Sequence, residues 1–356
     1  MANIYDYLDK YGDILFSDKK FNEIDACILS CMSYLELDGI VSSGREYTTL
    51  FWAMKEFCTD AKRREYNTRG IPQKDMFYLA KVLMNKKRYQ NILLYNYVYK
   101  VTFDEQFGAL TMKLDDGTTF VSFEGTDNNI VGWEEDTKLC YSYPVPCQID
   151  AIKYLDKAIT IFEKNVIVGG HSKGGHLALI ASMNANFFDR DKIKKIYSFD
   201  GPGLRKQNIN SLKYKKVEKK LNLIMPNYSI VGLLLRHTDD FTVVKSNKKG
   251  INAHNPFNWE VKDDEFVRTE LSSLSKKIDN SLTIWLDDHD DKHRKQMCTA
   301  IFDIFRELEI YKTRDLLSVK NLFSVIKKSR KLDDETKDIL LDFIKSNVSR
   351  IREKNK

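Results

Sequence analysis

One short segment of the sequence has the residue types and spacing of a nucleophilic serine. Residues 165–178 read NVIVGGHSKGGHLA and contain Gly170-x-Ser172-x-Gly174. The apolar residues 166–168 predict a buried strand before the motif, and the pattern after it predicts an amphipathic helix. A serine on such a strand-to-helix turn projects its Oγ above the sheet, and the flanking glycines let neighbouring backbone pass close by. The segment therefore predicts a nucleophile elbow with Ser172 as the nucleophile.

A glycine-rich turn of this kind has two other interpretations, a phosphate-binding loop and a turn with a packing role only. A phosphate-binding loop needs Lys and then Ser or Thr after its last glycine, whereas Gly175 and His176 follow Gly174 here. A turn that only packs a helix against a strand stays open as the structural alternative.

A serine nucleophile needs a histidine base, and folds with this elbow place that histidine after the acid in the chain. His254 is favoured because it lies in a loop after the last strand-like segment, and His237, after the apolar run 230–235, is the alternative. His289 and His293 lie four residues apart in a charged helical region, which favours a solvated helix face over a base or a metal pair.

The acid that orients the base is expected at the end of a strand beside the elbow strand. Asp200 ends the strand-like residues 193–199 and precedes a Gly-Pro-Gly turn, so it is the leading candidate. Asp239 and Asp240, in a loop before a later strand, are the alternatives. Asp200 could also serve only as a cap of the turn at Gly201.

The elements that must position these residues alternate in the middle of the chain. Residues 20–85 read mostly as helix, and 95–103, 106–114 and 118–123 as antiparallel strands. Short apolar strands and helices then alternate, which predicts an α/β fold with a mostly parallel sheet and helices on both faces. We expect a helical segment over 1–88, a core over 89–264 with a cap-like insert near 203–235, and a helical extension over 265–356.

Composition and charge exclude several classes of protein. The 356 residues are 42% hydrophobic and carry a net charge of only +6, which disfavours disorder and a dedicated nucleic-acid binder. Residues 203–222 hold seven Lys or Arg and one Glu, so the local excess equals that of the whole chain. With the apolar run 230–235, this stretch is read either as a lid facing anionic lipid or as a solvated helix face beside a buried segment.

The spacing of the cysteines bears on cofactors, and the first residues and the lengths of the apolar runs bear on location. The six cysteines form no CxxC pair and no zinc-type spacing with histidine, so no metal or other cofactor is expected. Residues 1–6 resemble no signal peptide, and no apolar run is long enough to span a bilayer. The expectation is a reduced, cytoplasmic protein.

The motifs together resemble those of the bacterial Mbeg-like family of α/β-hydrolases and, more distantly, the class 3 lipases. The resemblance rests on FNEID (21–25), FEGTD (123–127), WEED (133–136), GHSKGG (170–175), FDGPG (199–203) and HNPFNW (254–259). It implies an oxyanion hole built from Thr126 and the backbone N–H of Lys173, and it favours His254 as the base. Glu124 stands where the lipases usually have Arg, and Ser229 stands at the expected acid position of the class 3 pattern.

The resulting hypothesis is a serine hydrolase of the lipase or esterase type. Ser172, His254 and Asp200 would form its triad, and a small-molecule or lipid acyl ester, such as a lysophospholipid, would be its substrate. The lid interpretation would add weak contact with a membrane surface, and binding to nucleic acid is not expected. The alternatives are a hydrolase-fold binding or scaffold protein without turnover, motivated by Ser229, and an acyltransferase or thioesterase using the same triad.

Overall fold

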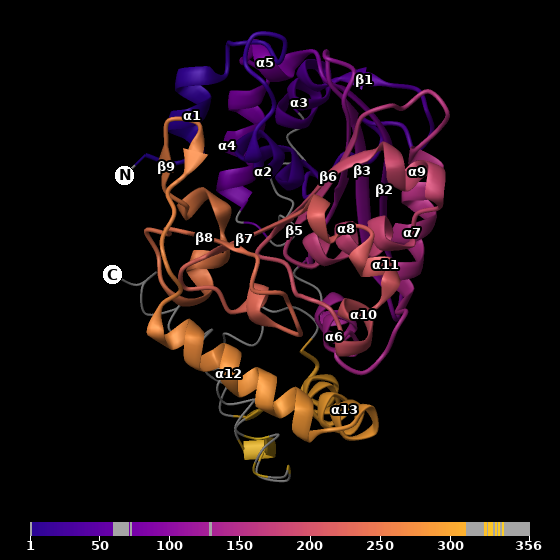
Figure 1. The fold of residues 1–356 in the computed structure, drawn as a ribbon, viewed down its shortest axis with the longest axis vertical. Coiled ribbons are helices and arrows are strands. Elements are labelled where there is room, and N and C mark those ends of the chain that lie inside the picture. Colours follow the sequence, from indigo (N-terminus) through magenta and orange to yellow (C-terminus); the bar gives the residue numbers. More distant parts are fainter. Residues whose placement is uncertain are drawn as a thin grey trace.

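An eight-stranded sheet forms the centre of the protein (Figure 1). The computed structural model describes residues 2–59, 71, 73–127 and 130–310, with scattered positions between 324 and 337. The strands lie side by side in chain order: β1 Thr48–Thr49, β2 Leu93–Val101, β3 Gln106–Lys113, β4 Thr119–Phe123, β5 Val166–His171, β6 Ile193–Phe199, β7 Leu221–Pro226 and β8 Thr242–Val244. Strands β1 to β4 pair antiparallel and β4 to β8 pair parallel. The predicted α/β fold is confirmed.

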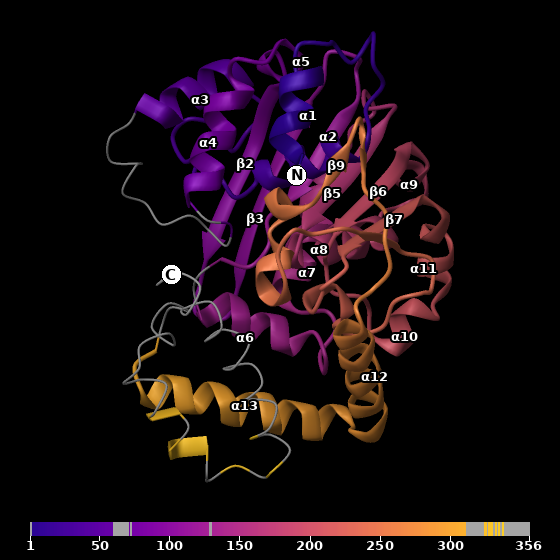
Figure 2. The same ribbon diagram turned by 90° about the vertical axis from the view of Figure 1, so that its left-hand side faces the viewer.

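The helices before β2 cover one face of the sheet (Figure 2). They are α1 Ile4–Tyr11, α2 Glu23–Met32, α3 Leu50–Thr59, α4 Gln73–Leu83 and α5 Lys87–Gln90. Helix α2 packs against β4, β5 and β6, and its N-cap is Asn22, whose side chain accepts hydrogen bonds from the N–H groups of Ile24 and Asp25. The predicted helical segment 1–88 therefore supplies one side of the core.

A buried ion pair fixes these first helices to one another. The Arg88 guanidinium bonds both carboxylate oxygens of Asp25, at 2.9 and 2.6 Å, and both side chains are fully buried. The hydroxyl groups of Tyr7 and Tyr89 donate to the same carboxylate. A buried pair is tolerated when its remaining hydrogen-bonding capacity is satisfied, as here.

The opposite face carries the helices that connect the later strands. These are α7 Pro146–Ala158, α8 Lys173–Asn184 and α9 Phe187–Lys192, while α6 Ile130–Lys138 follows β4 at the end of the sheet. Their apolar side chains and those of the sheet form a second core cluster, which includes Val168, Leu177, Ile180 and Ile196. The sheet is thus buried on both faces, as expected for parallel strands.

The basic stretch forms the crossover from β6 to β7, and it runs from the serine edge to the opposite end of the strands. It contains α10 Lys206–Ile209, α11 Leu212–Lys215 and the 3₁₀ turn Glu218–Lys220. Lys213 Nζ bonds Asn184 Oδ1 at 2.7 Å, and Asn184 is the last residue of α8. Because α8 has 12 residues, it is about 18 Å long, and Ser172 directly precedes its other end. The second half of the basic stretch therefore lies away from Ser172, whereas its start lies beside the first turn of α8, where His176 Nδ1 is 2.7 Å from the Gly203 carbonyl oxygen. The lid interpretation stays a prediction.

The apolar run 230–235 belongs to the interior. It forms the 3₁₀ turn Val231–Leu233, in which Gly232 and Leu233 are buried. A backbone bridge between Leu204 and Arg236 ties its end to the start of the crossover. This is the buried segment that the sequence left as the second interpretation.

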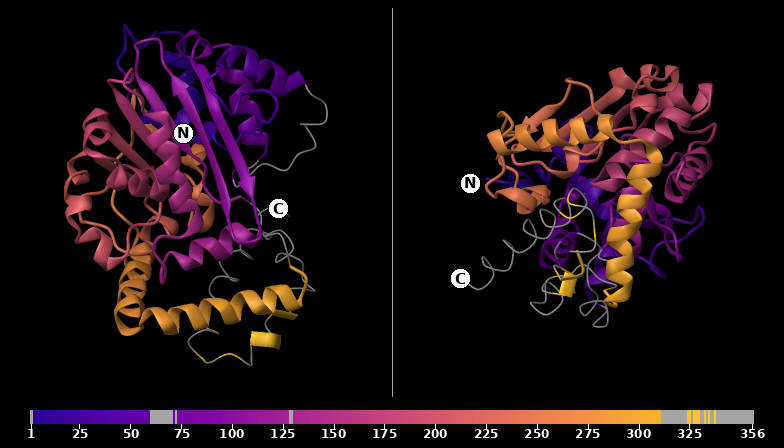
Figure 3. Two further views of the ribbon diagram at one scale, coloured as in Figure 1. Left: turned by 90° about the vertical axis from the view of Figure 1, so that its right-hand side faces the viewer. Right: turned by 90° about the horizontal axis from the view of Figure 1, so that it is seen from below.

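The chain after β8 first packs against the N-terminal helices and then forms two helices beyond the sheet. The short turns Gly250–His254 and Pro256–Asn258 precede a hairpin of β9 Val261–Lys262 and β10 Glu265–Phe266, which contacts α1 and α2. Helices α12 Ser273–Asp288 and α13 Asp291–Glu307 lie together beyond one end of the sheet (Figures 2 and 3). Most of the predicted extension after residue 310 lies outside the described residues. Among the described helices, none has the length and apolar character needed to cross a bilayer.

Candidate active site

Ser172 occupies a strained turn between β5 and α8. Its backbone φ and ψ are 59° and −133°, a conformation that residues with a side chain rarely adopt. A Cβ at Gly170 would lie 2.2 Å from the backbone carbon of Gly174, and a Cβ at Gly174 would lie 2.0 Å from the Phe123 carbonyl oxygen. Both glycines of the motif are needed because the start of α8 presses directly on β5 and β4.

Strand register places Asp200 at the same edge of the sheet as Ser172. His171 at the end of β5 pairs with Phe199 at the end of β6, and the Ser172 N–H donates to the Phe199 carbonyl at 2.9 Å. The next residue is Asp200, which is fully buried. Its Oδ2 lies 2.6 Å from His254 Nδ1. The structure thus brings together the acid and the base that the sequence favoured, 54 residues apart.

The second carboxylate oxygen of Asp200 is held by two groups that the sequence analysis did not assign to the site. Ser229 Oγ donates to Oδ1 at 2.5 Å, and the Gly232 N–H donates to the same atom at 3.0 Å. A Cβ at Gly232 would come within 2.5 Å of this oxygen. The only sequence signal for this role was Ser229 standing at the class 3 acid position.

His171 joins the elbow to the loop that carries His254. Its Nε2 lies 2.8 Å from the His254 carbonyl oxygen, and the two imidazole rings are 4.4 Å apart between centroids. Burial, reinforced by the neighbouring His254, holds the pKa of His171 well below its ordinary value. A neutral imidazole has one donor and one acceptor, so Nε2–H donates to the carbonyl and Nδ1 accepts.

The hydroxyl of Tyr34 supplies the donor to His171 Nδ1, at 2.9 Å. Tyr34 is buried and lies just after α2, in the helical segment that covers one face of the sheet. The same hydroxyl packs against Gly125, just after β4. A Cβ added at Gly125 would lie only 2.0 Å from it. The sequence alone gave no signal for this role of Tyr34.

The predicted oxyanion residues lie beside the serine. A Cβ at Gly125 would be 3.0 Å from Ser172 Cβ, so the chain passes the nucleophile directly before Thr126. The Thr126 hydroxyl donates to Asp136 Oδ2. Since that hydroxyl has a single proton, the backbone N–H is the group of Thr126 that is suited to an oxyanion. The N–H of Lys173, at the first position of α8, needs no partner within the helix.

The side chain of Lys173 points away from the reaction edge into a buried polar cluster. Its Nζ is 2.8 Å from the Gln106 carbonyl and 3.5 Å from Glu135 Oε2, and Asp136 Oδ1 is 4.0 Å away. Burial alone would lower the pKa of Lys173, but the nearby carboxyl groups outweigh it and raise that pKa. Burial raises the pKa of Asp136 to about 6, although Lys173 and the Thr126 hydroxyl oppose the rise.

The alternative candidates lie elsewhere. His237 Nε2 is 3.4 Å from Asp279 Oδ1 on α12, and Asp239 and Asp240 are exposed. The rings of His289 and His293 are 4.6 Å apart near the junction of α12 and α13. The part of the chain that the structure describes holds no group of three or more His, Cys, Asp or Glu side chains suited to a metal ion.

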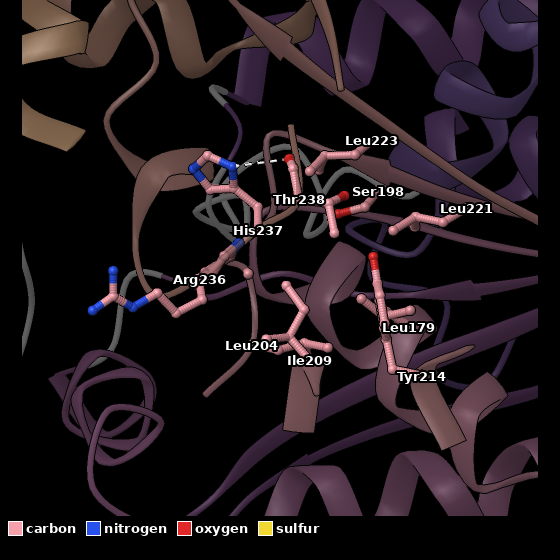
Figure 4. A pocket seen from close by; sticks show the side chains of 12 residues that line it. Leu179, Ser198, Leu204, Ile209, Tyr214, Leu221, Leu223, Arg236, His237 and Thr238 are labelled. Carbon is pink, nitrogen blue, oxygen red and sulfur yellow. Dashed lines mark hydrogen bonds between the residues drawn. The ribbon is translucent and has the colours of Figure 1, made fainter. Parts of the chain in front are cut away.

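A small apolar cavity lies behind the site, between α8 and the chain around residues 202–238 (Figure 4). Leu179, Leu204, Tyr214 and Leu223 contribute to its walls, with His237 at one side. Ser172, Asp200 and His254 are not among the residues that line it. The cavity therefore belongs to the packing of the crossover rather than to the reaction edge.

The parallel sheet with a serine on a strained strand-to-helix turn defines an α/β-hydrolase fold. The chain belongs to the Mbeg1-like family, whose model matches residues 83–303. The family resemblance drawn from the sequence is thereby confirmed.

Comparison with solved structures finds lipases at low similarity. The native Rhizomucor miehei lipase propeptide complex is 18% identical with a TM-score of 0.34, over 44% of this chain and 58% of that chain. M37 lipase is 12% identical with a TM-score of 0.37, over 74% of this chain and 80% of that chain. A fungal lipase in an inhibitor complex is 14% identical with a TM-score of 0.31, over 56% and 81%. A search of curated protein sequences finds no match.

Proposed function

We propose that the protein is a serine hydrolase that cleaves carboxylic esters through an acyl-enzyme. The observation that carries this proposal is the 2.6 Å bond from His254 Nδ1 to the buried Asp200, beside a serine in a strained elbow. An acid bonded to one imidazole nitrogen leaves the other nitrogen free to act as a general base. His171 directly precedes Ser172 in the chain, so the 4.4 Å contact between the rings of His171 and His254 supports a base near the serine.

The proposed reaction uses the same groups in both of its half-reactions. Ser172 Oγ attacks the acyl carbonyl while His254 Nε2 takes the hydroxyl proton, and Asp200 stabilises the resulting imidazolium. The N–H groups of Thr126 and Lys173 stabilise the oxyanion. The C–O bond to the alcohol then breaks, and the alcohol leaves with the proton from His254. Water deprotonated by His254 attacks the acyl-enzyme, which releases the carboxylic acid and free Ser172.

The bond between Asp200 and His254 also favours this proposal over a scaffold without turnover. A scaffold has no reason to keep a carboxylate oxygen within about 3.2 Å of a histidine nitrogen beside the elbow serine. Thioesters and acyl transfer use the same residues, so the acyl substrate itself has to distinguish those activities.

The decisive experiment is labelling with a fluorophosphonate probe, followed by peptide mapping. We expect one labelled residue, Ser172, and no labelling of Ser172→Ala at equal concentration of folded protein. A series of soluble p-nitrophenyl esters, with acyl-CoA thioesters in parallel, then ranks the acyl substrates. Unchanged labelling of Ser172→Ala, or no labelling of the folded wild type, would contradict the proposal.

A further inference from the structure

Among the described residues, most of the highly exposed large apolar side chains gather on one face. Five of the six most exposed among the described residues are 72–82% accessible and lie in three segments: Ile161, Phe162, Phe187, Phe188 and Leu212. The sixth, Phe103, is 91% accessible and lies at the tip of the β2–β3 hairpin. Exposed apolar groups that gather in this way mark a surface that meets an apolar partner.

Hydrogen bonds connect the three segments into one surface, which we call the α9 face (residues 156–164, 184–195 and 211–220). Lys192 Nζ at the end of α9 bonds the Thr160 carbonyl at 2.9 Å, beside Ile161 and Phe162. Lys213, next to Leu212, bonds Asn184 at 2.7 Å, just before α9 begins. Lys220 Nζ bonds the Arg190 carbonyl at 2.7 Å. In Figure 1, α7, α9 and α11 accordingly lie together at the right of the molecule.

The same face carries the basic excess of the chain. Its exposed acidic residues are Asp156, Asp191 and Glu218. Exposed lysines outnumber them and include Lys164, Lys194, Lys213, Lys215, Lys216 and Lys219. Apolar side chains surrounded by lysines match the two layers of an anionic bilayer surface, with acyl chains below negatively charged head groups.

The α9 face lies at the edge of the sheet opposite to Ser172. Residues 159–165 lead into the start of β5, whereas Ser172 follows its end, and a six-residue strand is about 20 Å long. Asn184 likewise ends α8, whose first residue follows Ser172. A partner on the α9 face therefore leaves the serine edge uncovered.

We propose that the α9 face docks the protein on anionic lipid bilayers, with Ser172 directed away from the membrane. Ile161 and Leu212 favour lipid over nucleic acid, because aliphatic side chains cannot stack on bases in the way that aromatic rings do. The docking does not depend on the proposed hydrolysis, since its residues and those of the serine site are separate.

The test is co-sedimentation of the purified full chain with vesicles of phosphatidylcholine alone or with 30% phosphatidylglycerol. We expect at least about tenfold more protein bound to the anionic vesicles at 0.1 M salt, and release at 0.5 M salt, because the Debye length falls. Equal binding to both vesicles, or no binding to either, overturns the proposal. Binding to single-stranded RNA without binding to vesicles overturns it as well.

Matched variants identify the face that binds. We expect Phe187→Ser with Phe188→Ser, and separately Lys215→Gln, Lys216→Gln and Lys219→Gln, to reduce vesicle binding about tenfold. Phe103→Ser is the control, because this exposed phenylalanine lies on a hairpin whose β3 begins beside the end of β4, at the serine edge. It should bind like wild type. Loss in Phe103→Ser with retention in the α9 variants would place the serine edge on the membrane instead. Circular dichroism verifies folding, and Phe162→Ser replaces the double variant if that variant unfolds.

Discussion

Ser229 Oγ lies 2.5 Å from Asp200 Oδ1, while the other oxygen of the same carboxylate bonds His254. Ser229 stands where the class 3 pattern would have the acid. Its hydroxyl donates to Asp200, which lies one strand earlier. With the Gly232 N–H as a third donor, the buried carboxylate has its hydrogen bonds satisfied on both oxygens. This arrangement makes the orientation of Asp200 depend on a loop that follows β7.

Replacing Asp200 by Asn should nearly abolish ester hydrolysis and leave the fold intact. The amide cannot stabilise an imidazolium and can favour the wrong tautomer of His254, so we expect kcat to fall about 10³- to 10⁴-fold. Steady-state kinetics on a p-nitrophenyl ester measures this. Asp239→Asn is the control, because Asp239 is exposed, and it should keep wild-type kcat. The opposite ranking would move the acid to the loop before β8.

Ser229→Ala should lower kcat about three- to tenfold, because Asp200 loses one of the donors on Oδ1 but keeps the Gly232 N–H. Gly232→Ala should be more severe, since the added Cβ would come within 2.5 Å of that oxygen and must displace it. The kcat values of both variants, compared after thermal melting has established folding, test the order. If Ser229→Ala were the more damaging change, the position of the carboxylate would not control the rate.

Tyr34→Phe should slow catalysis by loosening His171 and, through it, the His254 loop. The loss of a buried hydrogen bond is expected to cost about 1–2 kcal/mol of unfolding free energy and to lower kcat about tenfold with KM unchanged. The matched control is Tyr97→Phe, which removes another buried hydroxyl, one that donates to the Leu35 carbonyl at 3.2 Å. It should lose similar stability in urea unfolding but keep kcat. If Tyr34→Phe and Tyr97→Phe had equal kcat, Tyr34 would contribute to stability only and not to the position of His254.

Asp136 should make the stability of the protein depend on pH near 6. Burial raises its pKa in the folded state to about 6 from an ordinary 3.8, so the folded protein binds a proton more tightly than the unfolded chain. The stabilisation from this proton is complete below pH 3.8 and is lost as the pH rises through about 6, to a total of about 3 kcal/mol. Between pH 4 and pH 6, urea unfolding should therefore show a decrease in the free energy of unfolding that Asp136→Asn lacks. Parallel curves for the two proteins would contradict this.

The elbow and the order of the elements follow from local sequence patterns. Gly170, Ser172 and Gly174 are close neighbours in the chain, and the strand and helix around them each have a local periodicity. The strand-end position of Asp200 and the loop position of His254 were also readable, because both follow recognisable strands. The parallel sheet then implied that residues ending neighbouring strands share one edge.

The surroundings of these residues depend on contacts between segments that are far apart in the chain. Tyr34 and Ser229 reach the site from a helix on one face and from a loop after β7, and no local pattern marks either contact. The sequence also did not show which residues of the basic stretch lie near Ser172. A crossover between parallel strands starts at one edge of the sheet and ends at the other, so only part of it can lie at the serine edge. The physical reason is the same in each case: periodicity fixes which face of an element is apolar, whereas strand register and the direction of the crossovers fix which distant residues meet.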